Sequence, residues 1–247
     1  SASVSASIAV KPTSVIVSTL SGPMRQVERT AEASVTYQLS YADGSPVSTM
    51  SSNSTMVSIM SVPGKKVIEE VPLEPSDPAT GKWKVAWVPP VSTNLTEYYF
   101  ELAPASFDDS YGNIGRGAPV RSDPFDVVPA NLAPAFQMNS TLQRTQEADV
   151  VIIVKYHDGS NFGDVAQTTG SIMGAKTTDP LALTFNATLN EFTGHFKVPV
   201  NADLGFWRII VNIRDAYGNT ASGDFRVQIV RAELKFAVDY PAQVERT

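Results

Sequence analysis

The stretch Ser34–Tyr41 reads SVTYQLSY, and the stretch Asp149–Tyr156 reads DVVIIVKY. Both are rich in β-branched and aromatic residues, which favour β-strands. Each leads into a Tyr-x-Asp-Gly-Ser turn signal, at Tyr41–Ser45 in one case and at Tyr156–Ser160, 115 residues later, in the other. The same strand-and-turn unit therefore occurs twice, at a spacing typical of one domain.

Four further pairs of short matches follow the same order in the two halves. Val27–Thr30 (VERT) matches Leu142–Thr145 (LQRT), again 115 residues apart. The other three pairs are 113, 106 and 100 residues apart, as loop deletions in the second half would produce. They are Thr80–Lys84 (TGKWK) with Thr193–Lys197 (TGHFK), Asp109–Asn113 (DSYGN) with Asp215–Asn219 (DAYGN), and Pro124–Val127 (PFDV) with Asp224–Val227 (DFRV). The sequence therefore predicts an internal repeat, with one domain over residues 1–129 and a second over residues 130–247.

The two ends of the chain look like parts of neighbouring repeats. Val244–Thr247 spells VERT again, and the alternating segment Leu234–Tyr240 precedes it, so residues 233–247 match the first strand of a further repeat. Ser5–Val10 resembles a closing strand such as Phe225–Val230. A strand without its sheet leaves backbone groups unpaired. We therefore expect the end segments to pair with a neighbouring molecule, the alternative being that they complete the two domains.

The remainder of the chain has the pattern of an all-β protein. Lys82–Val88 alternates, with Trp83, Val85 and Trp87 on one face, and Phe206–Ile213 is a further strand. Prolines lie between these segments, and no long window has a helical stripe, which is typical of a β-sandwich. We expect the large apolar residues to form its core, among them Trp83, Trp87, Trp207, Phe196, Met56 and Met60.

Composition excludes several classes of function. The chain has no cysteine, a formal net charge of −6 and scattered cations, which disfavours thiolate chemistry and nucleic-acid binding. Its longest apolar run, Val150–Val154, is far shorter than a membrane span. The two histidines, His157 and His195, stand at polar positions without a nucleophile or zinc motif. We therefore expect no enzyme activity and no cofactor.

The repeated Asp-x-Tyr-Gly-Asn motif has two interpretations. As a turn, its aspartate caps backbone N–H groups while its glycine accepts a positive φ angle. As a calcium site, it would use carboxylate and amide oxygens, but calcium takes six to eight oxygens and the motif supplies fewer. We favour the turn and keep calcium as the alternative. The candidate ligands are Asp108, Asp109, Asn113, Asp215 and Asn219.

Two features of the sequence concern glycans. Four Asn-x-Ser/Thr sequons favour a glycosylated surface; their acceptors are Asn53, Asn94, Asn139 and Asn186. An aromatic sugar-binding platform at Trp83, Trp87 or Trp207 is the alternative to the core interpretation, and it requires those side chains to be exposed.

The succession Y-x-D-G-S-P-V, T-G-x-aromatic-K-V and D-x-Y-G-N resembles tandem immunoglobulin-like repeats of archaeal and bacterial surface proteins, such as S-layer proteins, adhesins and accessory repeats of large secreted proteases. The resemblance covers about Val27–Val127 and Leu142–Val230, and it is weaker at Asn161-Phe162, where the first copy has Pro46-Val47. It implies two tandem immunoglobulin-like β-sandwich domains in an extracellular or cell-surface protein.

The function that the resemblance implies is a spacer, lattice or adhesion role without catalysis. The expected partners are neighbouring repeats or copies of the same protein, and glycans. The alternative is an accessory module of a large secreted enzyme that binds carbohydrate or docks substrate.

Overall fold

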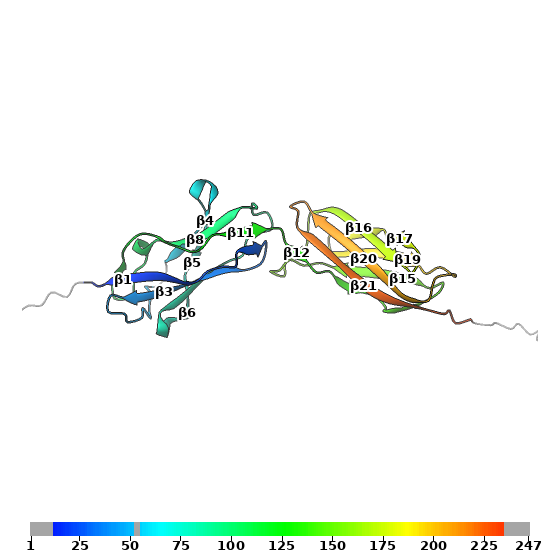
Figure 1. Ribbon diagram of the computed structural model, residues 1–247, viewed down its shortest axis with the longest axis horizontal. Helices are drawn as coiled ribbons and strands as arrows, with labels where there is room; N and C mark the ends of the chain where they lie inside the picture. Colours follow the sequence, from blue (N-terminus) through cyan, green and yellow to red (C-terminus); the bar gives the residue numbers. More distant parts are fainter. Residues whose placement is uncertain (1–11, 52–54, 235–247) are drawn as a thin grey trace, which may run out of the picture. The chain divides into compact units, whose positions relative to one another are not determined.

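The computed structural model describes residues 12–51 and 55–234. Within these ranges the chain forms β-strands and three short 3-10 helices, with no α-helix (Figure 1). The chain divides into two compact units, Ser1–Ala130 and Asn131–Thr247, called the first and second units below. The end strands expected at Ser5–Val10 and Leu234–Tyr240 lie outside the described residues, apart from Leu234.

The first unit consists of two sheets. One has the order β6 (Glu74–Asp77), β7 (Lys82–Trp87), β3 (Ala33–Tyr41), β1 (Ser14–Ser21) and β9 (Ile114–Gly115). The other has the order β2 (Gln26–Glu28), β11 (Phe125–Val128), β8 (Glu97–Leu102), β4 (Met56–Ser61) and β5 (Lys66–Pro72), and β10 (Val120–Arg121) also pairs with β8. Three 3-10 turns, each containing proline, connect strands: η1 (Pro63–Lys65), η2 (Pro78–Thr80) and η3 (Pro104–Ser106).

The second unit repeats this arrangement. One sheet has the order β13 (Ala135–Gln137), β15 (Glu147–Ile153), β19 (Glu191–Lys197) and β18 (Leu183–Asn186). The other has the order β12 (Asn131–Leu132), β21 (Thr220–Val230), β20 (Gly205–Asp215), β16 (Val165–Met173) and β17 (Thr178–Pro180), and β14 (Thr141–Gln143) also pairs with β21.

Both units have the strand order of an immunoglobulin-like sandwich. In one sheet β1, β3, β7 and β6 of the first unit correspond to β13, β15, β19 and β18 of the second. In the other sheet β11, β8, β4 and β5 correspond to β21, β20, β16 and β17. The expected central strands are confirmed, because β3 lies between β1 and β7 and β15 lies between β13 and β19. The fold class predicted from the sequence is therefore correct, although the strand expected to reach Tyr156 ends at Ile153.

The cores lie between the paired sheets, as alternation predicted. In β7 the side chains of Trp83, Val85 and Trp87 are buried. The ring of Trp87 packs at 5.3 Å from Tyr98 and at 6.3 Å from Phe125, which joins the two sheets of the first unit. All three tryptophans and Met60 are buried, whereas Phe196 and Met56 are half-buried. The tryptophans therefore belong to the core and cannot form an exposed aromatic platform.

The register of the strands corrects the match between the two T-G motifs. Val35 pairs with Val85, and Val150, its counterpart 115 residues later, pairs with Gly194. Gly194 therefore corresponds to Val85, so the TGKWK and TGHFK segments are not equivalent positions. TGHFK lies wholly within β19, whereas TGKWK begins in the turn before β7, so the similarity of their letters does not mark equivalent positions.

The structural counterpart of Gly81 is Asn190. Both stand immediately before equivalent strands and have a left-handed backbone, at φ 75° and φ 53°. Glycine and asparagine are the residues that adopt this conformation most readily. The shared requirement is thus a backbone angle, which two different residues satisfy.

The closing strand also has a different register from the one expected. Val127 pairs with Val27, and Ile229 pairs with Leu142. Since Val27 and Leu142 are equivalent, the two strands are 102 residues apart and not 100. A shift of two residues keeps the same face of a strand inward, so the alternating pattern alone could not detect it.

Candidate functional site

The Asp-x-Tyr-Gly-Asn segment of the first unit is a turn built around the buried carboxylate of Asp109. Its Oδ1 accepts the backbone N–H groups of Tyr111 and Asn113, both at 2.8 Å. Its Oδ2 accepts the Tyr41 hydroxyl at 2.5 Å and the Asn113 side-chain amide at 2.7 Å. Tyr41 ends β3, 68 residues earlier in the chain, so this carboxylate ties a distant strand to the turn.

The second unit has the same network around Asp215. Its Oδ1 accepts the backbone N–H groups of Tyr217 at 2.9 Å and Asn219 at 2.8 Å. Its Oδ2 accepts the Tyr156 hydroxyl at 2.6 Å and the Asn219 side-chain amide at 2.7 Å. We call this arrangement of tyrosine, aspartate and asparagine the Tyr–Asp–Asn corner.

The corner changes the titration of its members. Burial raises the pKa of the Asp109 carboxyl, but hydrogen bonds from Tyr41 and Asn113 outweigh burial and hold this pKa below its usual value. Burial, followed by the hydrogen bond to Asp109, raises the pKa of the Tyr41 phenol to about 12. Burial and the bond to Asp215 likewise raise the pKa of Tyr156. In the first unit the ionised Asp109 and the neutral Tyr41 are therefore the stable pair.

The Tyr-x-Asp-Gly-Ser motifs are also turns with a carboxylate cap. Asp43 accepts the backbone N–H of Ser45 at 3.0 Å and its hydroxyl at 2.6 Å. Asp158 accepts the same two groups of Ser160 at 2.9 and 2.6 Å. These bonds lower the pKa of both carboxyls. The serine hydroxyl thus donates to the aspartate within its own turn.

The arginine of the VERT motif holds a distant loop. Arg29 is buried, and its Nε donates to the carbonyl oxygen of Thr93 at 2.7 Å. In the second unit Nε of Arg144 donates to the carbonyl oxygen of Ala202 at 2.8 Å. The two loops lead into equivalent strands, β8 in the first unit and β20 in the second.

A further hydrogen bond recurs at the start of β8 and of β20. In each unit a side chain there donates to a backbone carbonyl of the loop that precedes its own strand. The Tyr98 hydroxyl donates to the carbonyl oxygen of Asn94 at 3.0 Å. Trp207, its counterpart, donates through Nε1 to the carbonyl oxygen of Asp203, also at 3.0 Å. This is the tyrosine corner of immunoglobulin-like domains, with tryptophan in place of tyrosine in the second unit.

The candidate calcium ligands form two pairs. Asp109 lies with Asn113, and Asp215 lies with Asn219, but the Asp108 side chain is exposed and accepts the Ser51 hydroxyl instead. Among residues 12–51 and 55–234, no group of three or more His, Cys, Asp or Glu residues could hold a metal ion. Calcium binding stays an alternative to be tested.

Three of the four sequon asparagines lie on the surface. Asn94, Asn139 and Asn186 are exposed and lie in loops or at a strand end, whereas Asn53 lies outside the described residues. The side-chain oxygen of Asn186 accepts the backbone N–H groups of Thr188 and Leu189 at 3.0 and 3.2 Å. No helix in the described part of the chain is long and apolar enough to cross a membrane.

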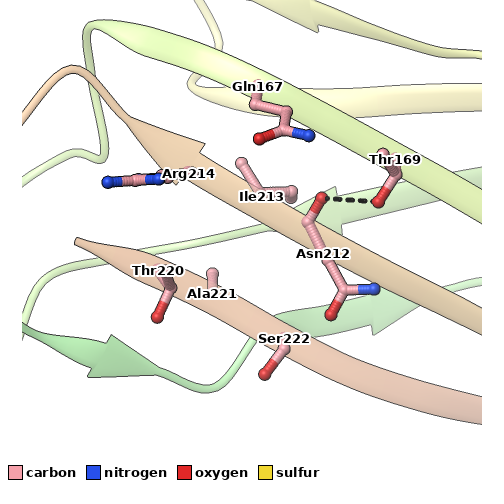
Figure 2. A pocket seen from close by; sticks show the side chains of 8 residues that line it. All are labelled: Gln167, Thr169, Asn212, Ile213, Arg214, Thr220, Ala221 and Ser222. Carbon is pink, nitrogen blue, oxygen red and sulfur yellow. Dashed lines mark hydrogen bonds between the residues drawn. The ribbon is translucent and has the colours of Figure 1, made fainter. Parts of the chain in front are cut away.

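A surface hollow of about 300 Å³ lies on the outer face of β16, β20 and β21 (Figure 2). It was not predicted from the sequence, because outward polar residues on a strand look like an ordinary hydrated face. The one sequence feature that could have indicated the hollow was the amide and hydroxyl side chains at alternate positions of β16, β20 and β21. The lining residues are Gln167, Thr169, Asn212, Ile213, Arg214, Thr220, Ala221 and Ser222.

No protein-family model matches the chain, and no curated protein matches it. Three solved structures illustrate its structural neighbours. The Escherichia coli adhesin FdeC has a TM-score of 0.33 at 12% identity, with 90% of this chain and 66% of that chain covered. A marsupial T cell receptor has a TM-score of 0.35 at 10% identity, with 91% and 74% covered. The outer capsid protein Hoc of bacteriophage RB49 has a TM-score of 0.32 at 8% identity, with 90% and 71% covered. This chain therefore spans less than two thirds of the adhesin chain. At these scores we infer function from the chain's own residues.

Proposed function

We propose that the chain is a non-catalytic structural module, a spacer within a surface-layer or adhesin-like extracellular protein. In this role each unit holds a fixed length and presents its loops and sheet faces. The chain needs no cofactor for it, and its partners are neighbouring repeats or copies of the same protein.

One observation carries this proposal: the residues that recur in the two units hold the fold. Asp109 and Asp215 are buried and accept four hydrogen bonds each. Arg29 and Arg144 bond to loop carbonyls. A repeated catalytic group would instead be expected to face a cleft with an unoccupied proton donor or acceptor.

The proposed location rests on the exposed sequons. Asn94, Asn139 and Asn186 stand at accessible positions, where attached glycans would not disturb the core. The absence of cysteine does not conflict with this location, because a sandwich of this size can be stabilised by core packing without disulfides.

The alternative function is an accessory module that binds carbohydrate or docks substrate for a large secreted enzyme. The hollow on β16, β20 and β21 favours this alternative, since it gathers amide and hydroxyl groups on one exposed face. An accessory module requires specific surface residues that contact its ligand, whereas a spacer requires only a fixed length and a stable fold.

A domain replacement separates the two functions. In cells that make the protein, residues 12–234 would be replaced by two unrelated immunoglobulin-like domains of similar length. A spacer should tolerate the exchange, with unchanged assembly or adhesion of the cells. Loss of adhesion or of substrate capture, with the exchanged protein at normal surface density, would contradict the spacer and favour the accessory module.

Antibodies to this chain test the location independently. They should label intact cells. Labelling that requires permeabilised cells would overturn the extracellular assignment while leaving the structural role open to the exchange experiment.

A further inference from the structure

The two units differ at the residue before the buried aspartate of the Tyr–Asp–Asn corner. The first unit has Asp108 there, and the second has Arg214. The positions are equivalent in the fold, because Asp108 pairs across its hairpin with Ile114 as Arg214 does with Thr220. An anion in one unit is thus replaced by a cation in the other.

The surroundings of this residue differ as well. The Asp108 carboxylate accepts a hydrogen bond from the Ser51 hydroxyl, so it already has a partner within the first unit. The Arg214 side chain is exposed, and its guanidinium has no hydrogen bond or ion pair with any described residue. Across the strand it faces Gln167, which is also exposed.

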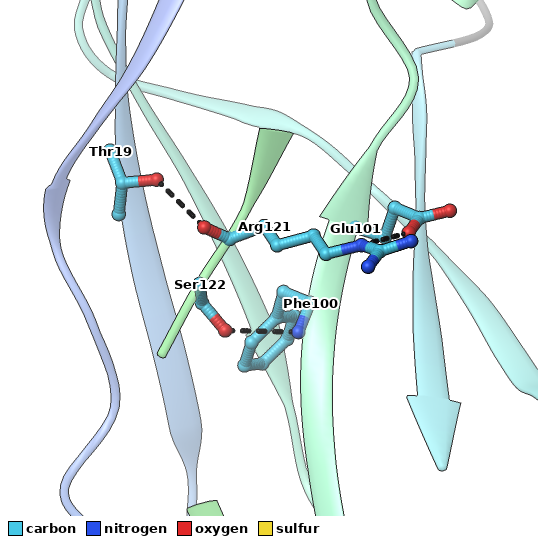
Figure 3. Close-up of polar contacts among 5 residues, drawn as sticks. All are labelled: Thr19, Phe100, Glu101, Arg121 and Ser122. Carbon is cyan, nitrogen blue, oxygen red and sulfur yellow. Dashed lines mark hydrogen bonds and ion pairs between the residues drawn. The ribbon is translucent and has the colours of Figure 1, made fainter. Parts of the chain in front are cut away.

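Two other exposed arginines on the outer faces of the units have acidic partners. In the first unit Arg121 donates to Glu101 at 2.6 Å (Figure 3). Its guanidinium also lies over the Tyr99 ring, 5.2 Å from the centroid. In the second unit Arg208 pairs with Asp224 at 3.0 Å. Arg214, within the hollow, has no such partner among the residues that the structure describes.

The hollow around Arg214 has the chemistry of a hydroxyl-rich ligand site. Gln167 and Arg214 form one row across the strands, while Thr169, Asn212 and Ser222 form the next row (Figure 2). Amides and hydroxyls both donate and accept hydrogen bonds, which matches sugar hydroxyl groups. The Thr169 hydroxyl already donates to the Asn212 carbonyl at 3.3 Å, which leaves its lone pairs free to accept.

A guanidinium beside such groups selects for an anion. Its planar fork matches a carboxylate with two parallel hydrogen bonds. The hollow, at about 300 Å³, is at the lower end of the ~300–1,000 Å³ range of small-molecule sites. One sugar ring with one carboxylate fits both its size and its polarity.

We propose that this hollow binds a carboxylated sugar unit of an acidic saccharide. Arg214 pairs with the carboxylate, and Gln167, Asn212 and Ser222 bond to the ring hydroxyls. The proposal goes beyond the spacer role and does not rest on it. Because it uses the hollow that favours the accessory module, saccharide binding would support that alternative function, whereas its absence would leave the spacer role unaffected.

The test is a titration of the isotope-labelled chain, followed through backbone amide shifts in NMR spectra. The probes are trigalacturonate, a hyaluronan tetrasaccharide, neutral galactotriose and sodium acetate. We expect saturable shifts confined to β16, β20 and β21 with at least one acidic saccharide. Added salt should weaken this binding because the pairing is ionic. Galactotriose and acetate should bind at least about tenfold more weakly, because galactotriose lacks the carboxylate that pairs with Arg214 and acetate lacks the ring hydroxyls.

Arg214→Gln should raise the dissociation constant about tenfold by removing the charge-assisted pair. Arg226→Gln is the matched control, since Arg226 is exposed on the same face but outside the hollow. The proposal is overturned if neither acidic saccharide gives a saturable shift, if galactotriose binds equally well, or if the two variants behave alike. Unchanged amide dispersion in both variants verifies that each is folded.

Discussion

The last hairpin differs most between the two units. In the second unit β20 and β21 have 11 residues each and pair without interruption. In the first unit the same part of the chain is divided among the short strands β9, β10 and β11. Its sequence contains Pro104, Pro119 and Pro124, whereas residues 205–230 contain no proline. Proline lacks the N–H that a ladder requires, so the first unit cannot form the long hairpin.

The Tyr–Asp–Asn corner is nevertheless the same in both units. Its bonds have nearly equal lengths around Asp109 and Asp215. We conclude that the corner, rather than the strand ladder beside it, fixes this end of each sandwich. The variants below test that conclusion, with the most damaging ones first.

Asp109→Ala and Asp215→Ala should each destabilise their own unit strongly. Each removes a buried acceptor and leaves a tyrosine hydroxyl, an asparagine amide and two backbone N–H groups without a partner. A buried donor left without its partner costs ~1–3 kcal/mol, so we expect a loss of at least about 3 kcal/mol in the free energy of unfolding. Urea unfolding followed by tryptophan fluorescence measures it.

Asp123→Ala and Asp179→Ala are the controls, one in each unit, because both side chains are exposed. They should change the free energy of unfolding by less than ~0.5 kcal/mol. If Asp109→Ala costs no more than its control while Asp215→Ala costs several kcal/mol, the corner supports only the unit with the long hairpin.

Tyr41→Phe and Tyr156→Phe should have an intermediate effect. Each removes the hydroxyl that donates to the buried aspartate and leaves the ring in place. Hydrogen bonds to charged groups contribute ~1.5–3 kcal/mol, so each variant should lose about that much stability at neutral pH. Urea unfolding at pH 7 is the measurement, and a loss no larger than that of the exposed aspartate controls would contradict the bond.

Tyr41→Phe also has a distinct behaviour at high pH. The folded state raises the pKa of Tyr41 to about 12, above the ordinary value of ~10. The stabilisation is therefore complete below pH ~10 and is lost as the pH rises from there to about 12. The wild type should lose stability over that window and approach Tyr41→Phe. Equal slopes of stability against pH for the two proteins in that window would show that the hydroxyl contributes nothing.

The sequence predicted the strands because the repeat and the alternation of residues such as Trp83 and Val85 report inward and outward faces directly. It placed Asp109 and Asn113 in one turn, since residues four apart can meet locally. It did not predict the bond to Tyr41, because sequence spacing does not report which distant strand end meets a turn. The signal was present, since a tyrosine before Asp-Gly accompanies Asp-x-Tyr-Gly-Asn in both copies.

The register errors have a different physical cause. Gly81 and Asn190 both adopt the left-handed backbone conformation, although they are different residue types. Because the comparison of the two copies used residue identity, it aligned Gly81 with Gly194 instead of with Asn190. The hollow at Arg214 was missed because its chemistry depends on which cations lack a partner. Pairing across strands decides that, and only the structure shows it.

Tyr37→Phe should have a small effect of the opposite sign. Tyr37 is fully buried, and its hydroxyl has no hydrogen-bond partner among the described residues. Its counterpart in the second unit is Ile152, which has no polar group to bury. Removing an unsatisfied buried hydroxyl should stabilise the first unit by about 1 kcal/mol, as urea unfolding would show. A loss of comparable size would mean that the hydroxyl has a bound water as partner.

Removal of calcium is the change from which we expect no effect, and it separates the two interpretations of Asp-x-Tyr-Gly-Asn. Calcium requires six to eight oxygen ligands, but in both corners the aspartate oxygens already accept N–H and O–H donors, which a cation would have to displace. A chelator should therefore leave the melting temperature of both units unchanged in a calorimetric scan. A metal that binds only the native state must raise that temperature, so a drop of several degrees that added calcium reverses would establish the metal site. Asp109→Ala and Asp215→Ala would then show which unit holds it, because only the variant that lost its site would stop responding to the chelator.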